Sequence, residues 1–115
     1  MTKNMTGKRT IAVVDLPKRL TLRHIQPFLL GIGDLLNTDR PRIVFDLSQV
    51  REIDGAGTDM LLHCAEQVLR QDGSLNLASV PAEVLVVLEL TRMDRLFEIF
   101  SSRSEAVENL AGIAS

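Results

Sequence analysis

The fold is decided by residues 42–57, which read RIVFDLSQVREIDGAG. Residues 42–47 are nearly continuous in apolar side chains, a pattern typical of a central strand that is covered on both faces of a sheet. After a polar joint, residues 53–57 suit a tight turn into a helix. Because strand ends, helix amino ends and free backbone amides meet at such a turn, we expect the function here. The turn holds the carboxylate of Asp54 and no hydroxyl before Thr58, which favours a recognition surface over a catalytic centre.

Strand and helix patterns alternate through the rest of the chain. Apolar residues spaced by three and four predict a helix after each strand; Gly73 ends the second helix, and Ser102 and Glu105 have the spacing of a capping box before the last one. Pro27 fits the first helix if that helix begins near His24. The alternation predicts a single α/β domain with about four strands, mostly parallel, and four helices. The expected strands are residues 10–14, 42–47, 75–80 and 96–100. In the first helix the expected buried positions are Leu22, Ile25, Phe28, Leu29, Ile32, Leu35 and Leu36. In the later helices they are Leu61, Leu62, Ala65, Val68 and Leu69 in the second, Val84, Leu85 and Leu88 in the third, and Ala106, Val107 and Leu110 in the fourth.

Length and composition narrow the classes of function. The chain has 115 residues, which favours one domain, and we expect a flexible tail over residues 1–8 before a domain over residues 9–115. There is no Trp, no Tyr and only four Phe, so the chain lacks the rings on which single-strand nucleic-acid modules stack bases. The net charge is −2 and the basic residues are scattered, which argues against nucleic-acid binding.

Cys64 is the only cysteine, so the chain can form neither an internal disulfide nor a cysteine metal cluster. Its place in an apolar helix pattern predicts an inert, packed thiol. No apolar run approaches the roughly 18 residues that span a bilayer, and the amino terminus lacks an apolar signal core. We therefore expect a cytoplasmic protein without direct membrane insertion.

The order of elements, together with residues 46–57 (DLSQVREIDGAG), resembles the STAS domain. This is the family of anti-sigma factor antagonists and of the carboxyl-terminal domains of sulfate transporters. In the family pattern, a hydrophobic strand ends in Asp-Leu, and Ile-Asp-Ser-Ser/Ala-Gly opens a helix a few residues later. The resemblance covers nearly the whole chain from about Thr10, with residues 73–78 (GSLNLA) and 96–100 (LFEIF) similar to the later strands. It implies a STAS-like domain over residues 9–115.

The chain departs from the family pattern at Gly55. In antagonists that are switched by phosphorylation, a Ser or Thr directly follows the motif aspartate. The residues here are Gly55 and Ala56, which have no hydroxyl to accept a phosphoryl group, so no phosphorylation is expected at the usual site. The amino-terminal portion is also short, since the family usually has an extra strand before the first helix and residues 10–14 are the only clear strand there.

The turn itself allows several interpretations. Asp54 could cap the second helix, recognise a basic residue of a partner, or act as a catalytic base, although no Ser, Cys or His lies close by in sequence. The Gly-x-Gly formed by Gly55, Ala56 and Gly57 is a weak phosphate signature, because the third glycine and the Lys are absent. It permits a tight turn and would also let another protein's backbone approach. Thr58 is expected to have a structural role in the first turn of the helix.

We therefore expect a non-enzymatic protein-binding module similar to an anti-sigma factor antagonist. The resemblance implies an anti-sigma factor with a histidine-kinase-like ATPase fold as the partner, bound through Asp54, Gly55, Ala56, Gly57 and Thr58. One alternative is the small cytosolic STAS subunit of a phospholipid-transporting ATPase, which needs no phosphoacceptor. A second alternative, a nucleotide- or anion-binding enzyme, is disfavoured by the missing set of reactive side chains. No cofactor and no metal site are expected, because the two histidines lie far apart in the sequence.

Overall fold

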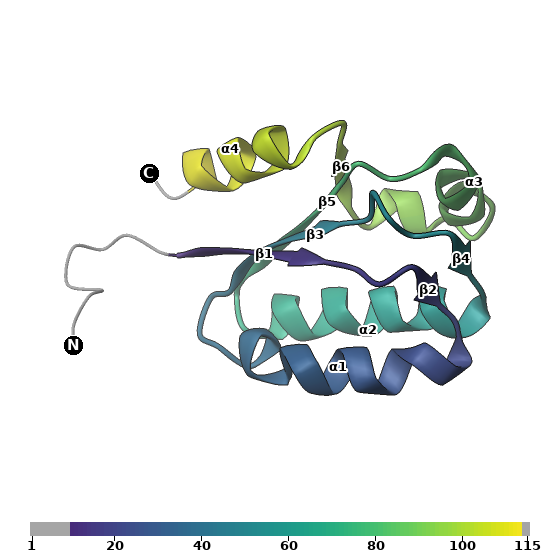
Figure 1. The fold of residues 1–115 in the computed structure, drawn as a ribbon. Helices are drawn as coiled ribbons and strands as arrows, with labels where there is room; N and C mark the ends of the chain where they lie inside the picture. The colour runs from purple at the N-terminus through teal and green to yellow at the C-terminus, as the bar shows by residue number, and fades with distance from the viewer. Residues whose placement is uncertain (1–9, 114–115) are drawn as a thin grey trace.

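The computed structural model describes residues 10–113, which form sheets and helices arranged in layers (Figure 1). The tail expected over residues 1–8 lies outside this described part of the chain. Strands and helices alternate in the predicted order, with two short strands added. In chain order the elements are β1 (Ile11–Asp15), β2 (Arg19–Leu20), α1 (Leu22–Leu36), β3 (Arg42–Asp46), β4 (Glu52–Ile53), α2 (Gly55–Arg70), β5 (Ser74–Ala78), α3 (Ala82–Leu90), a 3₁₀ helix (Met93–Arg95), β6 (Glu98–Phe100) and α4 (Arg103–Ile113).

The four longer strands form one sheet in the order β1-β3-β5-β6, and every pairing in it is parallel. β3 lies inside the sheet, where Ile43, Val44 and Phe45 are fully buried. Its continuous apolar run therefore predicted the position of this strand correctly. The α/β class, the four-stranded parallel sheet and the four helices are all confirmed.

Successive side chains of β3 point to opposite faces of the sheet, and each face has its own hydrophobic core. Ile43 and Phe45 belong to the main core, which α1, α2 and α3 cover, and Phe28 of α1 meets Phe45 edge-to-face with ring centroids 5.9 Å apart. Val44 points to the opposite face and packs with Ala106 and Leu110 of α4. Figure 1 shows α1 and α2 below the sheet and α4 above it.

Polar contacts fix α4 against its face of the sheet. The guanidinium of Arg103 donates to Asp15 at 2.6 Å and to Asp46 at 2.9 Å, which joins the carboxyl ends of β1 and β3 to the start of α4. The side-chain amide of Asn76 donates to the carbonyl of Ala106 at 3.1 Å. The Ser102 hydroxyl accepts from the backbone N–H of Glu105 at 3.2 Å, which is one half of the predicted capping box, while the Glu105 carboxylate accepts from the Ser101 hydroxyl at 2.7 Å.

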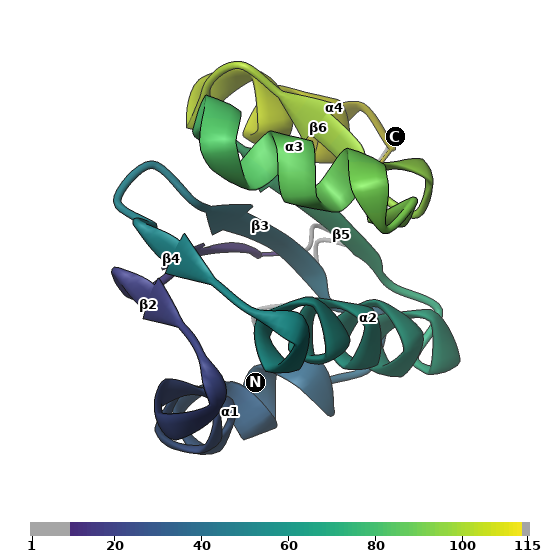
Figure 2. The same cartoon turned by 90° about the vertical axis from the view of Figure 1, so that its right-hand side faces the viewer.

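Two short strands, β2 and β4, form a second parallel sheet that the sequence analysis did not predict. Each has two residues, which is too short to show any alternation of apolar and polar side chains. The carbonyl of Lys18 also accepts from the backbone N–H groups of Arg51 and Glu52. Figure 2 shows that β2 leads into α1 while β4, beside it, leads into α2. The small sheet therefore brings the amino ends of the two helices together.

Some expected details of the helices are wrong. α1 begins at Leu22, two residues before the predicted start, so Pro27 lies inside the helix and not in its first turn. Leu22 and Leu69, both predicted to be buried, are 74% and 70% exposed. The other predicted positions of α2 are confirmed, since Leu61 and Val68 are fully buried and Leu62 and Ala65 pack against the core. The buried face also includes Met60 and Cys64, so its centre lies further from Leu69 than the spacing of apolar residues predicted.

The ends of the later strands also differ from the prediction. β5 covers Ser74–Ala78 where residues 75–80 were expected, and β6 covers Glu98–Phe100 where residues 96–100 were expected. Leu96 is exposed because the 3₁₀ helix Met93–Arg95 displaces the start of the strand.

Candidate functional site

Asp54 lies between β4 and α2 and caps α2. Its backbone is extended, and its Oδ1 accepts a hydrogen bond from the N–H of Gly57 at 3.0 Å. The residue as a whole remains exposed to solvent. The helix-cap interpretation is therefore confirmed, and the exposed carboxylate stays available for contact with another molecule.

The second oxygen of the same carboxylate serves the other helix. Oδ2 of Asp54 accepts from the N–H of Leu22, the first residue of α1, at 3.2 Å. Thr21 precedes α1 but gives it no side-chain cap, because its hydroxyl pairs with Nδ1 of His24 at 2.9 Å. Asp54 thus supplies the missing cap, and its charge lies at the positive ends of two helix dipoles. No local sequence pattern predicts this contact, because it joins residues that are 32 positions apart in the chain.

The two residues after Asp54 form an open surface. Gly55 is exposed, and a Cβ atom placed on it would meet no neighbour within 4 Å. Ala56 is half-buried. The surface therefore has room for another chain to approach the carboxylate closely.

Gly57 and Thr58 face the interior. A Cβ atom on Gly57 would lie 2.1 Å from the carbonyl oxygen of Leu20, so the backbone that approaches this glycine is the chain's own. Thr58 is 7% exposed, and its hydroxyl donates to the carbonyl of Gly55 at 2.9 Å. Of the five residues predicted to bind a partner, the structure thus places two inside the fold and leaves Asp54, Gly55 and Ala56 accessible.

Charged side chains border this accessible turn. Asp59, one turn into α2, is exposed. Across the small sheet, Arg19 and Glu52 form an ion pair with an Nε–Oε1 distance of 3.3 Å, and both side chains are largely exposed. Nothing in the sequence places Arg19 near the turn, because strands as short as β2 and β4 leave no periodic pattern.

Neither a reactive thiol nor a cluster of metal ligands lies among the described residues. The thiol of Cys64 is fully buried, and burial raises its pKa to about 12, so it stays protonated at neutral pH. Within residues 10–113, His, Cys, Asp and Glu side chains form no group of three that could hold a metal ion. No helix in that range is long and apolar enough to span a bilayer.

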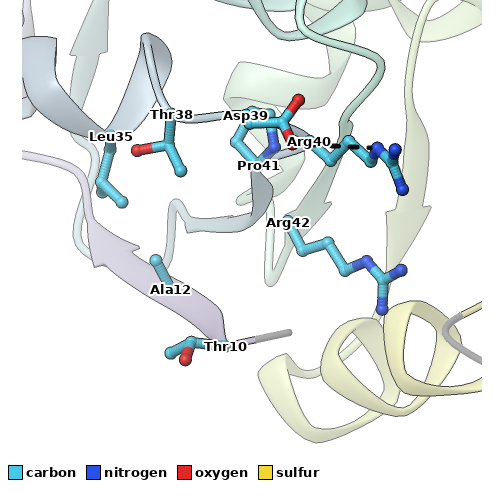
Figure 3. Close-up of a pocket in the computed structure, with 8 residues that line it drawn as sticks. All are labelled: Thr10, Ala12, Leu35, Thr38, Asp39, Arg40, Pro41 and Arg42. Atoms are coloured by element: carbon cyan, nitrogen blue, oxygen red, sulfur yellow. Dashed lines mark ion pairs between the residues drawn. The ribbon is translucent and has the colours of Figure 1, made fainter. Parts of the chain in front are cut away.

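A cavity of about 300 Å³ lies at the opposite end of β3 from the turn (Figure 3). Thr10, Leu35 and Thr38 line it on one side. The guanidinium groups of Arg40 and Arg42 extend to the other side in Figure 3, away from the two hydroxyls. The polar groups therefore do not converge on a common point, as the polar groups of a ligand site usually do.

The strand order bears on the nucleotide-binding alternative. Open parallel sheets bind nucleotides where the strand order reverses and two neighbouring loops diverge. Here the described crossovers lead from β1 to β3, then to β5, then to β6, always in the same direction across the sheet. The sheet formed by the described residues therefore offers no such crevice.

Comparison with known proteins agrees with the fold described above. The model of the family described as "Mlab, STAS domain" matches residues 4–99. A candidate anti-sigma factor antagonist homologue of Thermotoga neapolitana is 29% identical over 96 residues, which is 83% of this chain and 85% of the relative. A candidate anti-sigma factor antagonist of Thermotoga maritima is 29% identical over 94 residues, or 81% and 83% of the two chains.

Solved structures show the same architecture. The crystal structure of a candidate anti-sigma factor antagonist from Thermotoga maritima superposes with a TM-score of 0.77 at 29% identity, covering 85% of this chain and 86% of that one. The STAS domain of a SulP transporter from Vibrio cholerae superposes with a TM-score of 0.69 at 14% identity, covering 92% and 82%. The latter similarity shows the fold alone.

Proposed function

The chain belongs to the STAS domain family, and from this membership we propose that it is a non-enzymatic protein-binding module of the anti-sigma factor antagonist kind. Its partner is an anti-sigma factor with a histidine-kinase-like ATPase fold, which it sequesters so that a sigma factor is released. The names of the Thermotoga relatives support this choice of partner class. The proposal includes a cytoplasmic location, since sigma factors act there on RNA polymerase.

The observation that carries the proposal is the fixed, exposed carboxylate of Asp54 beside two small residues. Hydrogen bonds from Gly57 and Leu22 hold both of its oxygens, so little further side-chain freedom is lost when a partner binds. Gly55 and Ala56 leave space for the partner's backbone. We assign recognition of a basic side chain of the partner to Asp54, and close backbone approach to Gly55 and Ala56.

The interaction, as proposed, is not switched by phosphorylation at the usual site. Gly55 has no hydroxyl, and the hydroxyl of Thr58 is buried and already donates to a backbone carbonyl. The protein then acts as a constitutive antagonist whose effect is set by its abundance.

A second candidate function is that of the small STAS subunit of a phospholipid-transporting ATPase. Gly55 favours it, because that role requires no phosphoacceptor in the turn. The two candidates use the same accessible turn and differ in the class of ATPase that binds to it.

Affinity capture separates the candidates. The tagged full chain is used to capture partners from the lysate of its source organism, with the Gly55→Arg variant as the control for the turn. We expect the wild-type chain, but not the variant, to enrich an anti-sigma factor. Enrichment of a transport ATPase would establish the second candidate. Equal enrichment by both chains would place the interface away from the turn.

A further inference from the structure

The two edges of the main sheet are built differently. β6 forms one edge with only three residues, of which Glu98 is charged and exposed. Short length and charge are common devices by which proteins prevent an edge strand from pairing with another chain. β1 forms the other edge with five residues, IAVVD, and carries no Lys, no Pro and only one charge. That charge, on Asp15, is already paired with Arg103.

Among the described residues, β3 is the one strand that pairs with β1, and no described strand pairs with the other side of β1. Figure 1 shows this strand along the near edge of the sheet, with α1 below it and α4 above. Val13, at the middle of the strand, is 37% exposed. Among the large hydrophobic residues that are exposed in the described part of the chain, it is the one that lies in a strand.

We propose that β1 is a dimerisation edge, which pairs antiparallel with β1 of a second copy so that Val13 of each chain lies opposite Val13 of the other. Side chains alternate between the two faces along a strand, and opposite residues of an antiparallel pair lie on the same face. When two identical strands pair, opposite residues must therefore both have odd numbers or both have even numbers, so that the two numbers sum to an even number. A two-fold axis at Val13 meets this condition and pairs all five strand residues, with Ile11 opposite Asp15. The two four-stranded sheets then form one continuous sheet of eight strands.

The edge is complementary to itself in this register. The exposed, β-branched Val13 meets an identical side chain, which is a favourable cross-strand pair. Each Asp15 faces Ile11, so the two carboxylates lie about 14 Å apart along the strands and do not repel at close range. A symmetric contact of this kind closes after two copies and leaves no further edge of the same type exposed. A second copy of the chain is therefore the partner that the edge fits.

Cysteine crosslinking tests both the surface and the register in the full chain. The native Cys64 is fully buried, so it does not compete with an introduced thiol. Under mild oxidation, Val13→Cys should give a disulfide-linked species of twice 12.7 kDa, because the Cα atoms of opposite residues lie about 4.5–5.5 Å apart. Ile11→Cys, on the same strand and face, should not crosslink, since the two copies of residue 11 lie about 14 Å apart.

Light scattering after size exclusion provides the second measurement. The wild-type chain should approach twice the monomer mass as its concentration rises to the high micromolar range. Val13→Lys should stay monomeric with an unchanged melting temperature, because edge strands commonly carry Lys. Val86→Lys, on the exposed side of α3, serves as the matched control and should still dimerise.

Three results would overturn the proposal: a wild-type chain that stays monomeric throughout, a dimer that survives Val13→Lys, or equal crosslinking of Val13→Cys and Ile11→Cys. The proposal does not depend on the proposed function, because β1 contributes no residue to the turn at Asp54. Capture of a partner and dimer formation are read out separately, so either can fail alone.

Discussion

Asp54 and Leu22 are joined by a hydrogen bond in which the first backbone N–H of α1 donates to the carboxylate that caps α2. The distance is 3.2 Å, and the second oxygen of the carboxylate accepts from Gly57 at 3.0 Å. One side chain therefore sets the position of two helix starts relative to each other. A substitution at Asp54 therefore changes the stability of the fold and the exposed turn together, so stability and partner binding have to be measured separately.

Replacing Asp54 should destabilise the fold in a graded way. Asn caps a single helix about as well as Asp, but its side chain has one acceptor oxygen where Asp54 uses two. We expect Asp54→Asn to lower the free energy of unfolding by about 1 kcal/mol and Asp54→Ala by about 2 kcal/mol. Urea denaturation measures both. A neutral Asp54→Asn would contradict a functional hydrogen bond to Leu22.

The two glycines of the turn should respond in opposite ways to alanine. Gly57→Ala forces a Cβ atom against the carbonyl oxygen of Leu20 and should destabilise the protein by about 3 kcal/mol. Gly55→Ala meets open space in the first turn of a helix and should be neutral or stabilising by up to about 1 kcal/mol. Thermal melting of the two variants gives the comparison. Similar melting temperatures would mean that the backbone of Leu20 is not packed against Gly57.

The contact between Arg103 and Asp46 should make stability depend on pH. Burial alone would raise the pKa of the Asp46 carboxyl, but hydrogen bonds from Ser48 and Arg103 outweigh burial and hold it below its ordinary value of 3.8. The charged carboxylate therefore stabilises the fold above pH 3.8, and this contribution is lost as the pH falls through the lower folded pKa. At neutral pH, Arg103→Ala should have a lower melting temperature than the wild-type protein. This difference in melting temperature should disappear as the pH falls well below 3.8.

Arg95→Ala is the matched control for that experiment. Arg95 is exposed and takes part in none of the ion pairs found within residues 10–113, so its removal should not alter the pH dependence. The prediction is contradicted if the difference in melting temperature between the wild type and Arg103→Ala stays unchanged well below pH 3.8. Asp46 would then lose its charge over the same pH range in both proteins.

The turn should remain unmodified when the protein is incubated with a kinase-type anti-sigma factor and ATP. Gly55 and Ala56 offer no acceptor oxygen, and the Thr58 hydroxyl is buried. Intact mass spectrometry checks this, and Gly55→Ser serves as the positive variant, because a side chain at this position meets open space. Stoichiometric phosphate on Thr58 of the wild-type chain would restore a switch and refute the constitutive role.

The pattern of residues 42–57 predicted more of this molecule than any other stretch. The apolar run placed β3 inside the sheet, and the cap of α2 was one of the three interpretations that the sequence allowed for Asp54. Both features depend on neighbours in the sequence. The exposure of Leu69 could not be predicted, because the apolar face of α2 is broad and only its packing on the sheet determines which margin stays exposed.

The long-range part of the site was also hidden from the sequence. Leu20 approaches Gly57, and Leu22 reaches Asp54, only because the two-residue strands β2 and β4 pair. Strands this short leave no periodic signal. The sequence therefore showed that residues 54–58 lead into a helix, but it could not show which of them the rest of the chain covers.

The central claim is that the accessible turn formed by Asp54, Gly55 and Ala56 binds the partner. Its most direct test is the affinity of the purified anti-sigma factor for Gly55→Arg, measured by calorimetry beside Leu69→Arg, a control at the exposed far end of α2. We predict that Gly55→Arg, while still folded by thermal melting, binds at least about tenfold more weakly, or about 1.4 kcal/mol, and that Leu69→Arg binds like the wild type. Wild-type affinity in a folded Gly55→Arg protein would contradict the account.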